Sequence, residues 1–212
     1  MNNATQDDLR IQEDLSIQKN LLTQEDMRVQ RTKEAIRATF KQMMCEMDYG
    51  DITIKELAER ARINRKTFYL HFSKLEDLLI EIREAIIKDF LKRIKTYKLP
   101  KDLAIYIREF FTHQEELGIL GERIICIESN RYTLDRMSKA VARKTSEFAL
   151  GYDDSTMIKQ SIMLNFASQG ILGVFRQWIS SGKTIPLEEI IELTITLVCS
   201  GTDGFLTSNQ SY

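Results

Sequence analysis

Helix-breaking residues are scarce in this chain of 212 residues, which has only two prolines and nine glycines. Their scarcity favours long uninterrupted helices. Three scattered cysteines (Cys45, Cys126 and Cys199) form no C-x-x-C pair, so we expect reduced thiols in a cytosolic setting rather than a disulfide framework. No apolar run approaches the ~20 residues of a membrane helix, and the polar, acidic N-terminus does not resemble a signal peptide. We therefore expect a soluble cytoplasmic protein with no membrane partner.

Catalytic residue sets are equally scarce. The chain has only two histidines, His71 and His113, and shows no Ser-His-acid set, paired-carboxylate motif or phosphate-cradling glycine loop. The pair Gly118 and Gly121 is too short for a nucleotide fingerprint. A metal or thiol sensor built from His113 and Cys126 stays an alternative, although their spacing matches no recognised ligand pattern. We expect no enzyme, no cofactor and no metal.

The most informative segment reads TIKELAERARINRKTFYLHFSKLEDLL, from Thr53 to Leu79. Thr53 and Glu56 have the spacing of a capping box, which predicts a helix start. Asn64 is a good N-cap for a second helix over residues 65–72, and a second capping box, Ser73 with Glu76, predicts a third helix from Lys74. Two short helices at a tight turn, followed by a longer helix, are typical of a helix-turn-helix.

The charge distribution of the same segment favours nucleic acid as its partner. The net charge of the chain is only −1, but five basic residues and no acid lie between residues 60 and 74: Arg60, Arg62, Arg65, Lys66 and Lys74. A basic patch confined to one helix and its flanks is the electrostatic footprint of a groove reader. A solvated basic face is the alternative for the charge cluster taken alone.

The motif T-F-Y-x-H-F, which covers Thr67 to Phe72, resembles the recognition-helix signature of TetR-type transcriptional regulators. The resemblance extends over about residues 31–82 and is much weaker beyond. It departs in two places: family members often carry Gly where Arg62 stands, and their Lys at the start of the following helix falls on Leu75 here, one residue after Lys74. It implies an all-α protein with an N-terminal three-helix DNA-binding domain and a C-terminal helical domain for effector binding and dimerisation.

The side chains that we expect on DNA are Thr53, Arg65, Lys66, Thr67, Tyr69, Leu70, His71 and Lys74. Arg65 and Lys66, at the start of the second helix, are placed to reach base edges, since Arg offers two donors to guanine. Leu70 and His71 are expected at bases or the groove wall. The hydroxyls of Thr53, Thr67 and Tyr69 and the ammonium of Lys74 are better suited to phosphates.

Three regions follow from these patterns: a flexible polar arm over residues 1–29, the helix-turn-helix domain over 30–76, and a helical domain over 77–207. Gln recurs every six residues from Gln6 to Gln30, so the apolar residues of the arm share one face only if the arm is extended. A strand-like arm, a partner-binding segment and a disordered tail remain open. Beyond Lys101 we expect helices over about 103–111, 118–127, 133–150, 155–181 and from Pro186.

The last two helices are expected to form a homodimer. The final helix has almost no polar face, and small residues in the helix before it allow another helix to approach closely. The predicted interface residues are Ala167, Gly170, Val174, Ile190, Ile191 and Leu197. An apolar or aromatic effector is expected in a pocket lined by Phe110, Phe111, Tyr132, Phe148, Met163 and Phe166, for which ordinary core packing is the alternative. The stretch GILGVFRQWISSG also resembles a TetR subgroup that includes dihydroxyacetone-kinase operon activators.

The hypothesis is a homodimer that binds a roughly palindromic operator on double-stranded DNA, with its two recognition helices about 34–36 Å apart. A small-molecule effector would change that spacing by shifting the helix after the DNA-binding domain, provided that it binds one state better than the other. The alternative function is an interaction protein that uses the same fold without reading DNA.

Overall fold

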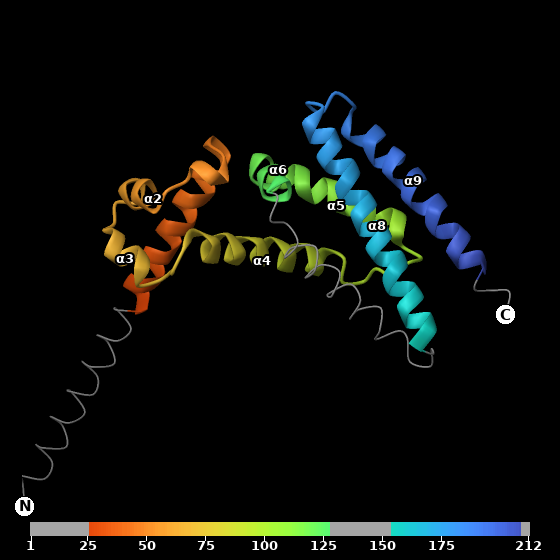
Figure 1. The fold of residues 1–212 in the computed structure, drawn as a ribbon, viewed down its shortest axis with the longest axis horizontal. Coiled ribbons are helices and arrows are strands. Elements are labelled where there is room, and N and C mark those ends of the chain that lie inside the picture. Colours follow the sequence, from red (N-terminus) through yellow and green to blue (C-terminus); the bar gives the residue numbers. More distant parts are fainter. Residues whose placement is uncertain (1–25, 128–153, 209–212) are drawn as a thin grey trace, which may run out of the picture. The chain divides into compact units, whose positions relative to one another are not determined.

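The computed structural model describes residues 26–127 and 154–208, and every regular element in them is helical. By its internal contacts the chain divides into two compact units, residues 1–78 and 79–212. Helix α4 (Leu75–Arg93) begins in the first unit and continues into the second. Figure 1 shows the helices of each unit, and the all-α class predicted from the sequence is confirmed.

The N-terminal unit opens with a helix over residues 26–46, which therefore includes the last residues assigned to the arm. The six-residue repeat otherwise lies outside the described residues. A short 3-10 turn (η1, Tyr49–Asp51) leads to α2 (Ile54–Arg60) and α3 (Arg65–Tyr69). The core of this unit is made of fully or almost fully buried side chains from the leading helix, α2, α3 and the start of α4: Ile36, Phe40, Met43, Met44, Leu57, Phe68, Phe72 and Leu78.

Local caps set where the short helices begin. The Thr53 hydroxyl accepts a hydrogen bond from the Glu56 N–H at 3.2 Å, and the Asn64 side-chain oxygen accepts one from the Lys66 N–H at 2.9 Å. Both predicted N-caps are confirmed. Helix α3 ends at Tyr69 rather than at residue 72, although hydrogen bonds from the His71 and Phe72 N–H groups to the Phe68 carbonyl continue the turn.

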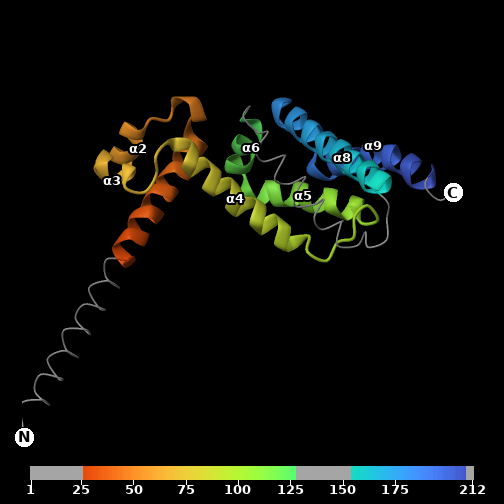
Figure 2. The ribbon, with the colours of Figure 1, turned by 60° about the horizontal axis from the view of Figure 1, so that its bottom comes forward.

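The C-terminal unit contains α5 (Leu103–Leu117), α6 (Ile119–Cys126), α8 (Asp154–Ser180) and α9 (Leu187–Ser208). The predicted helix over 133–150 lies outside the described residues. Helices α8 and α9 lie side by side in both ribbon views (Figures 1 and 2), and α5 packs against α9 while α6 packs against α8. Among the described helices, none combines the length and apolarity of a membrane span.

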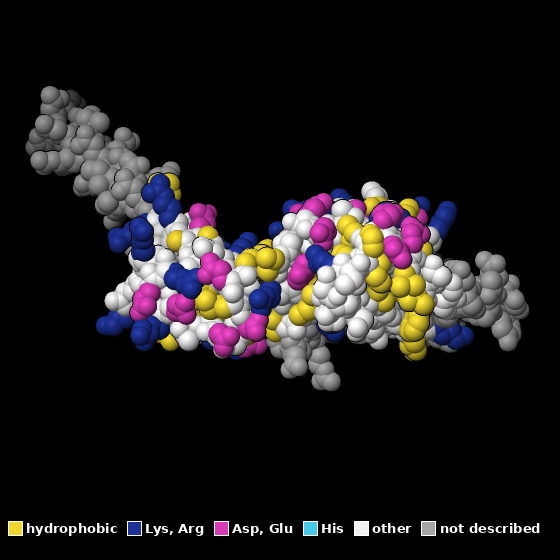
Figure 3. Space-filling model, turned by 90° about the horizontal axis from the view of Figure 1, so that it is seen from above, with side chains coloured by type: hydrophobic (Ala, Val, Ile, Leu, Met, Phe, Trp, Pro, Cys, Tyr) yellow, Lys and Arg dark blue, Asp and Glu magenta, His cyan; other side chains and the backbone are white. Residues whose placement is uncertain are grey.

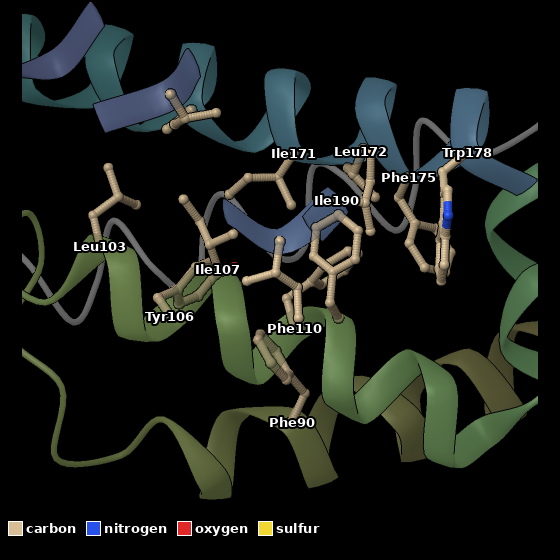
Figure 4. Packing of buried hydrophobic residues seen from close by; sticks show 14 of the residues in the cluster. Phe90, Leu103, Tyr106, Ile107, Phe110, Ile171, Leu172, Phe175, Trp178 and Ile190 are labelled. Carbon is tan, nitrogen blue, oxygen red and sulfur yellow. The ribbon is translucent and has the colours of Figure 1, made fainter. Parts of the chain in front are cut away.

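The core of this unit is aromatic. Phe110 and Phe111 on α5 meet Phe175 on α8 with ring centroids 5.5 and 5.4 Å apart, in edge-to-face geometry. Trp178 extends the cluster, and its indole N–H donates to the Ile185 carbonyl at 2.7 Å, so that its buried donor is satisfied. Figure 4 shows the α5 side chains pointing toward α8, with Phe90 of α4 on the other side of α5. Truncation of such an aromatic side chain to Ala costs about 3–5 kcal/mol, so these rings stabilise the whole unit.

Candidate DNA-reading interface

The recognition helix α3 divides its side chains between core and solvent. Phe68 is fully buried and Phe72 is 7% exposed, and their rings lie 5.7 Å apart. On the opposite side, Tyr69 is 57% exposed and Leu70 is 79% exposed. Phe68 and Phe72 therefore anchor α3 to the core of the N-terminal unit, while its other face stays open to a ligand.

The basic residues of the predicted patch differ in their availability. Arg65 and Lys66 are exposed at the start of α3, as is Arg62 in the turn before it. Arg60 instead forms ion pairs with Glu46 of the leading helix and, at 2.8 Å, with Glu56 of its own helix. These carboxylates raise the pKa of Arg60 and hold its guanidinium between two helices. Arg60 therefore links two helices of the domain by ion pairs. Its position within the basic segment of the sequence did not indicate this role.

The turn between α2 and α3 is left-handed at Arg62, which has φ 55°. At this position, members of the family that the sequence resembles often carry Gly. The turn is closed by hydrogen bonds from the Arg62 N–H to the Glu59 carbonyl and from the Ile63 N–H to the Ala58 carbonyl, at 3.2 and 3.0 Å. A residue with a Cβ pays about 1–2 kcal/mol for this conformation.

Replacement of Arg62 by Gly is therefore expected to raise the free energy of unfolding by about 0.5–1 kcal/mol, because the relief of backbone strain exceeds the entropy that Gly adds to the unfolded chain. Arg62→Ala removes the same side chain but keeps the strain, so it is the matched control. Denaturant unfolding followed by circular dichroism compares the two variants. Equal stability of R62G and R62A would contradict a strained turn.

The start of α4 differs in detail from the predicted capping box. Helix α4 begins at Leu75, and the carboxylate that accepts from the free N–H groups of Ser73 and Lys74, at 3.0 and 3.1 Å, belongs to Asp77. Glu76, which was predicted for that role, pairs with the Lys74 ammonium at 2.7 Å and raises the pKa of Lys74. Lys74 therefore reaches a phosphate only by exchanging Glu76 for it.

We expect Glu76→Gln to strengthen DNA binding about two- to fivefold at low salt, because it frees Lys74 and removes a negative charge beside the phosphates. The slope of log affinity against log salt is expected to steepen by about one per subunit. Fluorescence anisotropy at several salt concentrations measures both quantities. Glu189→Gln, which changes the same charge on exposed α9, is the control. Unchanged binding by E76Q would show that Lys74 makes no phosphate contact.

The remaining predicted DNA-contacting residues lie around α3. Thr53 is exposed at the start of α2, while Thr67 and His71 are half-buried. The exposed residues of α3 and its C-terminal end are thus Arg65, Lys66, Tyr69 and Leu70. Helix α2, the turn at Arg62 and the exposed helix α3 together form a helix-turn-helix, a motif of DNA-binding regulators.

Comparison with known proteins agrees with this class. Residues 36–82 match the family described as bacterial regulatory proteins, tetR family. A TetR transcriptional regulator from Streptococcus agalactiae has the same fold, with a TM-score of 0.62 at 21% identity over 82% of this chain and 97% of that one. The helix-turn-helix domain of this chain thus matches that of the tetR family, and its fold is similar to that of solved TetR regulators.

Further relatives are more distant or shorter in their match. The dihydroxyacetone kinase operon activator DhaS has a similar fold, with a TM-score of 0.52 at 21% identity over 80% of this chain and 95% of that one. An uncharacterized HTH-type regulator of Bacillus subtilis, YxbF, is 22% identical over 76% of this chain and 43% of its own length. The dhaKLM operon activator DhaS of Lactococcus lactis is 29% identical over 47% of this chain and 51% of its own length. The chain thus spans about half the length of the curated relatives it matches.

The predicted effector-pocket residues that the structure describes differ in their surroundings. Phe110 and Phe111 are buried in the aromatic core, and Met163 packs beside Leu164 in a separate small cluster. Phe166 is 56% exposed on α8. Tyr132 and Phe148 lie outside the described residues. Among these positions, the core alternative holds for Phe110 and Phe111.

A hollow of about 440 Å³ runs instead along α4, and the described residues that line it are Glu84, Ile87, Lys88, Leu91, Lys92 and Lys95. Its wall combines two aliphatic side chains with three lysines and one carboxylate, that of Glu84.

The residues predicted for the dimer interface are mostly used within one chain. Ala167, Ile190 and Ile191 are 1–4% exposed in the aromatic core, and Val174 packs against that core. A Cβ on Gly170 would lie 3.4 Å from a methyl group of Val198, so this Gly faces α9 of the same chain. Leu197 is the most exposed of the six, at 55%, and Gly170 and Val174 are partly exposed. Among the described residues, the exposed large apolar side chains of α8 and α9 are Leu197 together with Ile158, Ile162, Phe166 and Leu193.

His113 and Cys126, the pair considered for metal or thiol sensing, have different surroundings. His113 is 2% exposed on α5, and its Nε2 lies 3.4 Å from an Asp89 carboxylate oxygen on α4. Burial, with a contribution from Arg93, lowers the pKa of His113. Cys126 is exposed at the end of α6. Within residues 26–127 and 154–208, no group of three or more His, Cys, Asp or Glu side chains is placed to hold a metal ion.

Proposed function

We propose that the protein is a sequence-specific transcriptional regulator that binds a roughly palindromic operator as a homodimer and responds to a small-molecule effector. The observation that carries the proposal is the recognition helix: Phe68 and Phe72 fix it to the core, and Arg65 and Lys66 remain exposed at its start. An exposed Arg at the start of a recognition helix suits the guanine edge in the major groove.

The homodimer is supported by an exposed apolar stripe on α8 and α9. It consists of Ile158, Ile162 and Phe166 on α8 and Leu193 and Leu197 on α9, each 44–63% exposed. The spacing of four residues places each set on one face of its helix. A Cβ on Gly201 of α9 would lie 3.2 Å from the Phe166 ring, so the two faces adjoin. Figure 3 shows hydrophobic side chains gathered along this side of the C-terminal unit.

A stripe of this kind suits an isologous dimer, in which the same surface of each subunit meets its copy. Aromatic and aliphatic side chains fill the centre of such interfaces. Two acidic residues of α9 form ion pairs within the same chain: Arg108 of α5 pairs with Glu188 at 2.5 Å and with Glu192. The apolar face is thereby left as the self-complementary part of the surface.

The effector is proposed to bind along α4, because this helix begins in the DNA-binding unit and its later residues line the hollow in the C-terminal unit. Ile87 and Leu91 suit an apolar portion, and Lys88, Lys92 and Lys95 suit a negative group. A small amphiphilic anion fits this wall better than the purely apolar effector expected from the sequence. Such a ligand changes operator binding only through a difference in its affinity for the two states of the dimer.

Selection of bound sequences from a random duplex pool at fixed salt tests the proposal. Enrichment of a palindrome is expected, because two recognition helices in one dimer read two half-sites. Binding that depends on salt and enriches no sequence would refute the DNA-reading function. The result would then favour an interaction protein that uses the helix-turn-helix fold without sequence reading.

A further inference from the structure

Leu70 is the most exposed large hydrophobic side chain among the described residues, at 79%. It lies directly after α3, and its N–H donates to the Lys66 carbonyl at 3.2 Å. Its backbone angles, φ −69° and ψ −21°, continue the helical path. The direction of its side chain therefore follows from helical geometry.

At about 100° per residue, Leu70 lies about 200° around the helix axis from Phe68 and about 40° from Lys66. Phe68 is fully buried and points into the core of the N-terminal unit, so Leu70 points away from that core. Lys66 and Leu70 thus form neighbouring parts of one exposed face, a turn apart. The Lys66 ammonium lies near the start of this face, and the Leu70 side chain lies at its end.

An aliphatic side chain on this face has a single kind of complementary group in the major groove. Leu70 offers neither a donor nor an acceptor, so it cannot take part in the hydrogen-bond pattern of the base edges. The C5 methyl group of thymine is the apolar group that the major groove displays. A polar base edge opposite Leu70 would instead be desolvated without a partner, which is unfavourable.

We propose that Leu70 is a specificity-determining residue that contacts a thymine methyl group in each operator half-site. This inference rests on the proposed sequence-specific DNA binding. Arg65 and Lys66 contribute hydrogen bonds at the start of α3, and Leu70 adds an apolar contact at its end. The operator is therefore expected to contain an A·T pair, read through its methyl group, in each half-site.

Uracil substitution in the selected operator tests the contact, because uracil pairs like thymine and keeps its O4 acceptor but lacks the methyl group. Thymines are replaced at one symmetric pair of positions at a time, and the affinity of the full-length protein is measured. At one such pair we expect a loss of about fourfold per half-site, which corresponds to removing one buried methyl group. Leu70→Ala should bind the thymine and uracil duplexes equally at that position, while Arg65→Ala should keep the difference.

The inference is overturned if no thymine-to-uracil pair weakens the wild-type protein, or if L70A retains the full difference. Failure of the proposed function looks different, since no operator would then be enriched for either protein, and both proposals would fall. Because Leu70 is exposed, its truncation leaves the core unchanged, and circular dichroism of L70A confirms the fold before binding is measured.

Discussion

Replacement of Arg65 by Ala is expected to weaken binding to the operator by about tenfold to a hundredfold for each half-site, with little change in binding to random DNA. Arg65 is exposed at the first position of α3, directly after the Asn64 N-cap. Its planar guanidinium donates two hydrogen bonds to guanine, and neither Ala nor a water molecule reproduces that geometry. The lost affinity should therefore be specific to the guanine positions of the operator.

Arg65→Lys is the matched variant, because it keeps the charge and removes the paired donors. We expect R65K to retain the salt dependence of the wild-type protein but to lose most of the discrimination between operator and random duplex. Competition binding at one salt concentration measures that discrimination. Lys101→Ala, which removes one positive charge from the C-terminal unit, should behave as wild type. Equal loss of operator and random binding in R65A would mean that Arg65 contacts phosphate only.

The parts of the site that were predicted from sequence depend on local interactions. Thr53 and Asn64 cap N–H groups two or three residues away, so the identity and spacing of these residues determine the contact. The left-handed turn at Arg62 agrees with the family resemblance, since similar regulators often carry Gly at this position. The division of α3 between buried Phe68 and exposed Lys66 and Leu70 follows from helical periodicity, because these two side chains lie about 160° and 200° around the axis from Phe68.

Contacts between distant residues could not be predicted in the same way. Arg60 was included in the DNA-facing basic patch, but it pairs with Glu46, which lies 14 residues earlier on another helix. At the start of α4, Glu76 and Asp77 are both within reach of the free N–H groups, and side-chain geometry rather than spacing selects Asp77. The sequence shows where these charged residues lie along the chain, but it does not show which of them form ion pairs or hydrogen bonds.

The same limit applies to the C-terminal unit. Periodicity identified α9 as apolar on nearly all sides, but it could not tell which side packs against α5 and α8 and which side is exposed. Ile190 and Ile191 turned out to be core residues, whereas Leu193 and Leu197 are exposed. Phe166, predicted to line a pocket, lies on the exposed face of α8 beside Gly201. To assign these faces, one must know how α5, α8 and α9 pack together. The hydrophobic periodicity of one helix does not give that information.

Leu197→Asp is expected to convert the dimer into monomers and to abolish tight operator binding. In an isologous interface the substitution occurs twice, so both copies lose the burial of a leucine, about 1.5–3 kcal/mol each. Each new carboxylate also has to be desolvated or left facing an apolar surface. Together these effects predict that the dissociation constant of the dimer rises by at least about a hundredfold. Sedimentation over a range of protein concentrations measures it.

Ile105→Asp provides the control, because Ile105 is a similarly exposed aliphatic residue, at 52%, on α5 rather than on the α8 and α9 stripe. We expect I105D to remain dimeric and to bind the operator. A monomeric L197D protein should still contact DNA through its single recognition helix, but only with the weaker affinity of one half-site, because the two heads are no longer joined. If monomeric L197D kept full operator affinity, operator binding would not depend on dimerisation. A dimer that survived L197D would place the interface on another surface.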